Sequence, residues 1–221
     1  MKGKQSNLIT SKESKTLLEN ILSLGIVQGL NYILPLITIP YLVRVLGPEM
    51  YGLTSFAISF ITIFTLITNY GFNFSATKDI SINKKYHTKV SQIFSKVIFI
   101  KTVLFFICFL LLILLINYFD RFSINSKIYY LSFGIVLGQV ITPLWLFQGL
   151  EKMKYIMFID FISKSIFTFS IFIFVKGPDD YLLIPTLYSL GSILSGIFGL
   201  ILSTNIFKLK FEFPSFNDSL S

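Results

Sequence analysis

The sequence predicts an all-α integral membrane protein with six transmembrane helices. Of its 221 residues, 53% are hydrophobic and only 14% are charged, and the mean hydropathy is +0.73. A soluble domain of this composition would have too little polar surface to cover its apolar residues. The charged residues lie between apolar runs, and six runs approach the roughly 20 residues that a helix needs to cross a bilayer. These runs are residues 19–43, 51–72, 94–118, 128–149, 155–175 and 181–203.

The first two runs form a predicted helical hairpin joined by Val45-Leu46-Gly47-Pro48-Glu49. Each run carries polar residues at helical spacing, joined in the first run by a proline, which places them on one face of an otherwise apolar helix. Such a helix suits lipid on most sides and a hydrophilic interior on the other. The hairpin is therefore predicted to form part of the wall of a transport path. The first stripe is Gln28, Asn31, Pro35 and Thr38, and the second is Ser55, Ser59, Thr62, Asn69 and Asn73.

The connections between the runs predict a single helical bundle without a soluble domain. Residues 78–92 are polar and are expected to form a loop or a short surface helix, whereas the later connections are short. We therefore expect residues 1–210 to form one six-helix lobe. Residues 211–221 are expected to be the start of a linker between lobes or a truncated tail.

The distribution of lysine and arginine predicts that both ends of the chain lie in the cytoplasm. With six spans, thirteen of the 19 basic residues lie on the side of the N-terminus and four on the other. Basic residues are enriched in cytoplasmic loops, and an odd number of spans would scramble this division. The four on the outer side are Arg44, Arg121, Lys127 and Lys176.

Small residues predict close packing of the fourth and sixth spans. Gly134 and Gly138 are four residues apart, as are Gly191, Ser195 and Gly199. Small residues at this spacing let two helices approach closely in lipid. The same surfaces could instead slide past one another in a moving bundle, and the spacing alone does not separate the two interpretations.

Charged residues inside the apolar runs are the strongest candidates for a functional site. Asp160 and Lys164 are four residues apart in the fifth span, in the favourable order for an ion pair. A charge near mid-membrane costs at least ~2.5–3.5 kcal/mol, so such residues normally face a cavity or each other. The pair is either a structural, self-neutralising one, or a site for an anionic group or a proton relay through Asp160. Lys101, in the third span, either extends to the cytoplasmic headgroups or lines the path.

Several other functions find no support in the sequence. No glycine-rich nucleotide-binding loop and no nucleophile–base arrangement is present, so we expect neither an ATP-driven pump nor an enzyme. Cys108 and His87, each unique in the chain, have no companions at metal-ligand spacing. Nucleic-acid motifs are also absent. The apolar run after the N-terminal lysines is too long for a signal peptide and is expected to be a retained span.

Three stretches resemble the polysaccharide-biosynthesis flippases, the Wzx-type O-antigen transporters of the multidrug/oligosaccharidyl-lipid/polysaccharide exporter superfamily. They are NILSLGIVQGLNYILPLITIPYLVRVLGPEMYGLTSFA (residues 20–57), NYGFNFSATKDIS (69–81) and WLFQGLEKMKYI (145–156). The resemblance covers nearly the whole chain. The first two stretches are specific to the polysaccharide branch, and the third is less so.

The resemblance implies a function that the composition does not reveal. Members of this family move an undecaprenyl-pyrophosphate-linked oligosaccharide across the bacterial inner membrane by alternating access of two six-helix lobes. The resemblance implies no cofactor, and it implies that either H⁺ or Na⁺ is the coupling ion. The expected path-lining residues are Gln28, Asn31, Asn69, Asn73, Lys101, Asp160 and Lys164. Lys78 and Asp79, at the expected cytoplasmic mouth, either gate entry or anchor a helix end.

One departure from the family concerns length, because such transporters have about twelve spans and this chain has six. The chain is then either the N-terminal half of a longer protein or the partner of a second six-span chain, and we expect the former. An isolated half is not expected to transport. Alternatives include a drug/cation antiporter or a peptidoglycan-precursor flippase of the same architecture, a glycan polymerase component and a non-transporting scaffold. The sugar repeat and the coupling ion are not revealed by the sequence.

Overall fold

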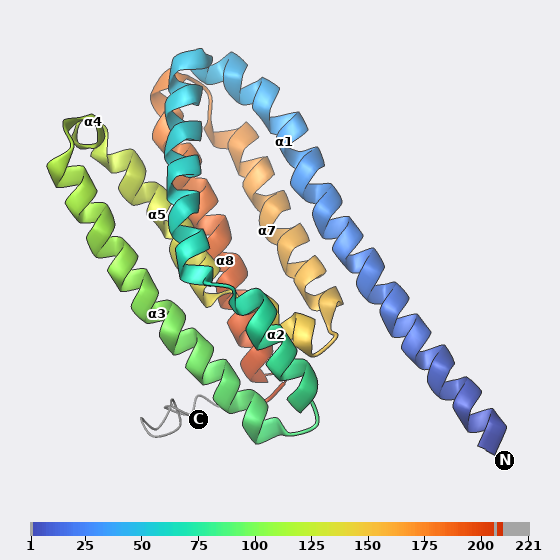
Figure 1. Ribbon diagram of the computed structural model, residues 1–221. Helices are drawn as coiled ribbons and strands as arrows, with labels where there is room; N and C mark the ends of the chain where they lie inside the picture. Colours follow the sequence, from blue (N-terminus) through green and yellow to red (C-terminus); the bar gives the residue numbers. More distant parts are fainter. Residues whose placement is uncertain (1, 206, 210–221) are drawn as a thin grey trace.

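A sharp turn at Gly47 divides the first helix into two antiparallel arms. In the computed structural model, α1 runs from Lys2 to Asn69, and its non-helical residue is Gly47, with φ 77° and ψ 164°. A positive φ at this position favours glycine, which has no Cβ to clash with the backbone. Figure 1 shows the first arm ascending and the second arm returning beside it. The predicted hairpin and its connection are confirmed.

The structure describes residues 2–205 and 207–209; the side chains of residues 2–17, 20, 23, 24, 27 and 30 are outside this description. Within it, five helical segments are long and apolar enough to cross a membrane. The first of these contains both arms of α1, so the five segments make six passes along the bundle. The start of α1 lies at the same end of the bundle as the last turn of α8 (Figure 1). The expected linker at 211–221 lies outside the described residues. The five segments are Asn31–Asn83, His87–Tyr118, Ser126–Gly149, Met153–Phe174 and Pro178–Asn205.

The second arm ends earlier than the sequence predicts. The helix stops at Asn69, and Tyr70 and Gly71 both have positive φ, 37° and 76°. A separate helix, α2, then runs from Phe72 to Asn83 and buries Ala76 and Ile80. The short surface helix expected near residues 78–92 is thus confirmed for its first part. The single helical face drawn through Asn69 and Asn73 is wrong, because the chain changes direction between them.

The fourth predicted span is also broken. After α3 (His87–Tyr118) and the turn α4 (Asp120–Ser123), α5 covers Ser126–Ile141. Thr142 is extended, Pro143 follows, and α6 continues from Leu144 to Gly149. The span predicted at 128–149 is confirmed as the crossing segment Ser126–Gly149. It is divided into two helices because Pro143 lacks an amide N–H and its ring obstructs the preceding turn.

The remaining helices complete the bundle. α7 spans Met153–Phe174, a short 3₁₀ helix η1 spans Pro178–Leu182, and α8 spans Leu183–Asn205. α8 packs along α5 and also contacts α7, and α7 in turn packs against α1. The described chain is helical in all its regular elements. This confirms the all-α membrane fold.

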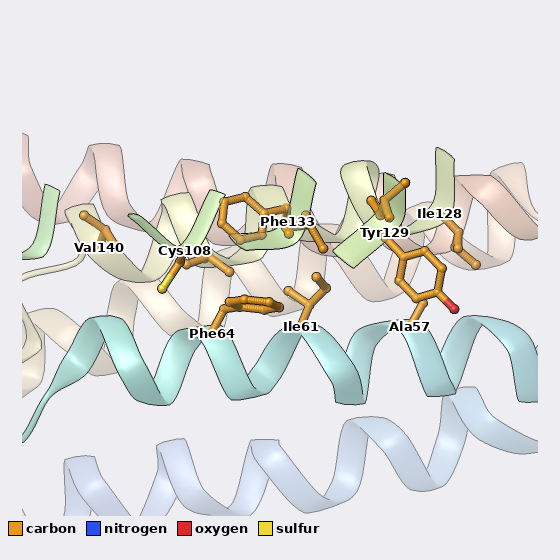
Figure 2. Packing of buried hydrophobic residues seen from close by; sticks show 11 residues of the cluster. Ala57, Ile61, Phe64, Cys108, Ile128, Tyr129, Phe133 and Val140 are labelled. Atoms are coloured by element: carbon orange, nitrogen blue, oxygen red, sulfur yellow. The ribbon is translucent and has the colours of Figure 1, made fainter. Parts of the chain in front are cut away.

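One apolar core joins the second arm of α1 to α3 and α5. Ala57, Ile61 and Phe64 of the arm face Tyr129 and Phe133 of α5 (Figure 2). Cys108 lies between them and is fully buried. Ring contacts tie the layers together, such as Phe64–Phe133, whose centroids are 5.8 Å apart at 72°. The second arm is therefore a packed structural element, with its buried face turned toward apolar neighbours.

Small residues allow α5 and α8 to touch backbone to backbone. A Cβ atom on Gly138 would lie 2.6 Å from Ile193 N, and one on Gly134 would lie 2.7 Å from Ser189 Cβ. On α8, Gly196 and Gly199 meet Ile141 and Pro143, whereas Gly191 faces Phe167 of α7. Packing of the fourth span on the sixth is confirmed. The expected row on α8 is partly wrong, because Gly196 takes the place given to Gly191.

This contact predicts that Gly138→Ala destabilises the protein. The added methyl group would overlap the α8 backbone, which cannot move aside, so we expect a loss of about 1–3 kcal/mol. Gly52→Ala is the matched control, since a Cβ there meets nothing within 4 Å and alanine favours the helix. Thermal unfolding in detergent measures both. Equal stability of the two variants would contradict the close α5–α8 contact.

Candidate functional site

Lys164 of α7 is the centre of a polar cluster between α7 and the first arm of α1. Its ammonium donates to Asp160 Oδ2 at 3.1 Å and to Asn31 Oδ1 of α1 at 2.5 Å. The Lys164 and Asp160 side chains remain 30% and 25% exposed, so this is not a sealed pair. An ammonium has three N–H donors, and these two bonds leave a third for a ligand or water. The structure thus joins the pair predicted on the fifth span to the polar stripe of the first.

A cavity of about 260 Å³ opens beside this cluster, between α5, α7 and α8. Its lining combines amide, hydroxyl and charged groups with apolar and aromatic side chains. A hydroxyl-rich or anionic ligand would find hydrogen-bond partners on several sides of such a cavity. The polar lining residues are Gln139, Thr142, Asp160, Ser163, Lys164, Tyr188, Ser192 and Ser195.

A second, smaller cavity of about 120 Å³ lies on the α1 side of the same lysine. Asn31, Pro35 and Thr38 line it from α1. Lys164, Phe167 and Tyr188 line both cavities, so the ammonium stands between them. Three of the four members of the predicted first stripe therefore share a cavity. The fourth, Gln28, instead donates from its Nε2 to the Tyr32 hydroxyl at 3.1 Å.

The stripe predicted on the second arm does not meet this site. Neither cavity beside Lys164 is lined by Asn69, Asn73 or another residue of that arm. Asn69 is the last residue of α1, and Asn73 lies on α2 beyond the break, where its carbonyl accepts from Thr77 Oγ1 at 2.6 Å. The physical reason is that the arm turns its inner face to the aromatic core. A path-lining role for Asn69 and Asn73 stays a prediction without support from these two cavities.

Lys101 is not a snorkelling lysine. Its side chain is 1% exposed, and Nζ donates to Gln139 O of α5 at 2.8 Å. Because the ammonium is enclosed and bonded to α5, extension to the headgroups is wrong. Lys101 also does not line the larger cavity, although Gln139 does.

The predicted gate residues lie on α2, away from the cluster. Lys78 and Asp79 are both exposed. The ion pair at this end joins Lys84 to Glu151, with Nζ and Oε1 2.9 Å apart. A Cβ on Gly149 of α6 would lie 2.6 Å from Ile80 Cβ, which shows how closely α2 packs on α6. The gating or anchoring role of Lys78 and Asp79 stays a prediction.

Sequence reasoning missed the hydroxyl groups of the larger cavity. Ser163 lies between Asp160 and Lys164 on α7, and Tyr188, Ser192 and Ser195 follow helical spacing on α8. That spacing was a usable signal, because i, i+4, i+7 residues share one face. Gln139 and Thr142 gave no such signal, since their exposure depends on the break at Pro143. Within the described ranges, no cluster of three His, Cys, Asp or Glu side chains could hold a metal ion.

Comparison with known proteins identifies the family. Residues 17–221 match the model of a family described as polysaccharide biosynthesis protein. The chain belongs to this family. It is 35% identical to an Escherichia coli (strain K12) protein named as a candidate O-antigen transporter, over 84% of this chain and 45% of the relative. A Shigella dysenteriae protein with the same name is 32% identical, over 83% of this chain and 46% of the relative. No solved structure matches.

These findings confirm the family resemblance, and the apolar helices make the chain a multi-pass membrane protein. The chain spans about half the length of the curated relatives it matches. The chain that carries the Lys164 cluster therefore corresponds to about half of each relative.

Asn31 gives a direct test of water access to the site. In a Cys108→Ala background, we expect Asn31→Cys to react with a charged, membrane-impermeant thiol reagent, because Asn31 lines a cavity that also exposes the Lys164 ammonium. Ile33→Cys is the control, since Ile33 is exposed on the same arm without lining either cavity. Labelling is measured by mass shift. Failure of Asn31→Cys to react faster than Ile33→Cys would contradict a hydrophilic site.

Proposed function

We propose that this chain is part of a flippase that moves a lipid-linked oligosaccharide across the bacterial inner membrane for polysaccharide synthesis. The supporting observation is the Lys164 cluster, a cation held by Asn31 and Asp160 between two cavities inside a membrane-spanning bundle of this family. The proposed substrate is an undecaprenyl-pyrophosphate-linked repeat unit of O-antigen or capsule. Two relatives are named as candidate O-antigen transporters.

The chemistry of the cluster suits a substrate that is anionic at one end and rich in hydroxyl groups. Lysine provides a compact cation for a phosphate oxygen. Asp160 neutralises that cation when the cavity is empty, which lowers the cost of keeping it within the membrane. The hydroxyl and amide groups of α5, α7 and α8 offer both donors and acceptors to sugar hydroxyls.

The size of the cavity fits only a portion of such a substrate. Its volume of about 260 Å³ lies just below the roughly 300–1,000 Å³ of typical ligand pockets. We propose that a second lobe supplies the facing wall, since each relative is about twice as long as the matched segment. The isolated chain is then not expected to transport.

An arriving anion would compete with Asp160 for Lys164. The carboxylate released from the ammonium could take up a proton, which couples substrate binding to H⁺; a cation such as Na⁺ could serve the same role. In this scheme the end of the bundle that carries α2 and α6 faces the cytoplasm, as the excess of lysine at that end predicts.

Substitution of Lys164 tests the proposal in the full-length transporter. Loss of a hydrogen bond to a charged group costs about 1.5–3 kcal/mol, so Lys164→Met should weaken substrate binding about ten- to a hundred-fold. Lys164→Arg should retain more activity. The control is Lys127→Met, an exposed lysine at the opposite end of the bundle from α2 and α6. Surface polysaccharide and lipid-linked repeat units on the cytoplasmic side are measured in cells lacking the chromosomal copy.

A flippase and a scaffold give different results in this experiment. If the protein is a flippase, the Lys164→Met variant lowers surface polysaccharide, and lipid-linked repeat units accumulate on the cytoplasmic side. A scaffold would lose polysaccharide only when the whole chain is removed. Transport by Lys164→Met at the level of Lys127→Met would refute the proposal.

A further inference from the structure

The break between α5 and α6 leaves the carbonyl of Gln139 without its helical donor. In a continuous helix, the carbonyl of Gln139 would accept from the N–H of residue 143. Residue 143 is proline, which has no N–H. The neighbouring carbonyl of Gly138 is satisfied, since Thr142 N and Thr142 Oγ1 donate to it at 3.0 and 2.7 Å. Leu144 N donates to Thr142 O, and not to the carbonyl of Val140 as it would in a continuous helix.

The missing donor is supplied by Lys101. Its ammonium lies 2.8 Å from Gln139 O, and the side chain is buried at 1% exposure. Neither ion pair in the described part of the chain includes Lys101. A buried cation in hydrocarbon and an unpaired carbonyl in hydrocarbon are both unfavourable. The hydrogen bond between them lowers both free-energy costs, because the carbonyl oxygen carries the negative end of a dipole and the ammonium is a strong donor.

The same break forms one wall of the cavity beside Lys164. Gln139 and Thr142 before it and Leu144 after it all line that cavity. On its other side, the break rests against α8, where a Cβ on Gly199 would lie 2.9 Å from Pro143 Cδ. The direction in which the Gln139 and Thr142 side chains point therefore depends on what holds the Gln139 carbonyl.

We propose that Lys101 is a positioning residue whose ammonium replaces the amide N–H missing at Pro143 and so fixes the α5–α6 wall of the cavity. Lys101 acts through Gln139 and does not touch the substrate. The effect on transport rests on the proposed function. The effect on stability and on the environment of the break does not, so the two can fail separately.

A double-mutant cycle tests the replacement directly in the full chain. Lys101→Met removes the donor, whereas Pro143→Ala restores an N–H at position 143, which donates to Gln139 O once Thr142 adopts a helical conformation. We expect Lys101→Met to lower the melting temperature in detergent by roughly 3–10 °C in the Pro143 background. In the Pro143→Ala background we expect less than half of that shift. Lys96→Met, an exposed lysine on the same helix, is the control and should show no coupling to residue 143.

A second measurement separates positioning from mere stability. Trp145, the one tryptophan in the chain, is fully buried two residues beyond Pro143. We expect Lys101→Met to shift its emission and to raise its quenching by acrylamide at temperatures where the variant is still folded. Lys101→Arg keeps a donor and should leave both close to those of the unsubstituted protein.

Several outcomes would overturn the proposal. The first is an equal loss of stability on Lys101→Met in both backgrounds, or unchanged Trp145 emission in a folded Lys101→Met variant. The second is an equal loss of transport in both backgrounds with normal stability, which would place Lys101 in direct contact with the substrate. If Lys101→Met does not accumulate, recovery by Pro143→Ala supports the proposal and failure to recover contradicts it. Should Pro143→Ala itself not fold, the comparison of Lys101→Arg with Lys101→Met decides, and equal loss in both refutes it.

Discussion

The need to satisfy every backbone polar group inside the membrane governs this structure. Water is absent from the hydrocarbon core, so a helix can break there only where protein groups replace the lost hydrogen bonds. The turn at Gly47 lies at one end of the bundle (Figure 1). At the bend between α1 and α2, Tyr70 N donates to Leu66 O, and Phe74 N and Ser75 N donate to Gly71 O. The break at Thr142–Pro143 lies among packed helices, and its free carbonyl receives the Lys101 ammonium.

Close packing of the helices depends on complementary shapes, because apolar side chains gain little free energy when they exchange contact with lipid for contact with one another. Along α5 and α8, glycine and serine bring two backbones into contact, and serine hydroxyls bridge them. Ser192 Oγ donates to Ile135 O at 3.1 Å, and Ser189 Oγ donates to Leu131 O. The aromatic core of α1, α3 and α5 fills the wider spaces on the other side. The cavity beside Lys164 lies where α7 meets this closely packed α5–α8 pair.

Local patterns in the sequence predict much of the fold but little of the site. Hydropathy and length locate the crossing segments, and the Val45–Glu49 connection locates the hairpin, because both depend on neighbouring residues. The Asp160–Lys164 pair is predicted for the same reason, being four residues apart on one helix. The bond from Lys164 to Asn31 joins residues 133 positions apart, and no local pattern encodes which helices become neighbours. The end of the second arm was misplaced because an apolar sequence continues smoothly across Tyr70–Gly71 while the backbone does not.

The two membrane lysines show why burial and chemistry must be weighed together. Each bears a cation within a crossing helix, and both are candidates for a substrate site on the sequence alone. Lys101 is enclosed and directed at a backbone carbonyl, so an approaching anion would have to displace helices to reach it. Lys164 is partly open, adjoins two cavities and is held by a carboxylate and an amide that belong to side chains and can move. Side-chain partners can exchange with a ligand at the cost of a rotamer change, whereas a carbonyl partner moves only with its helix. Of these two lysines, Lys164 is therefore the one that we propose to bind and release an anion.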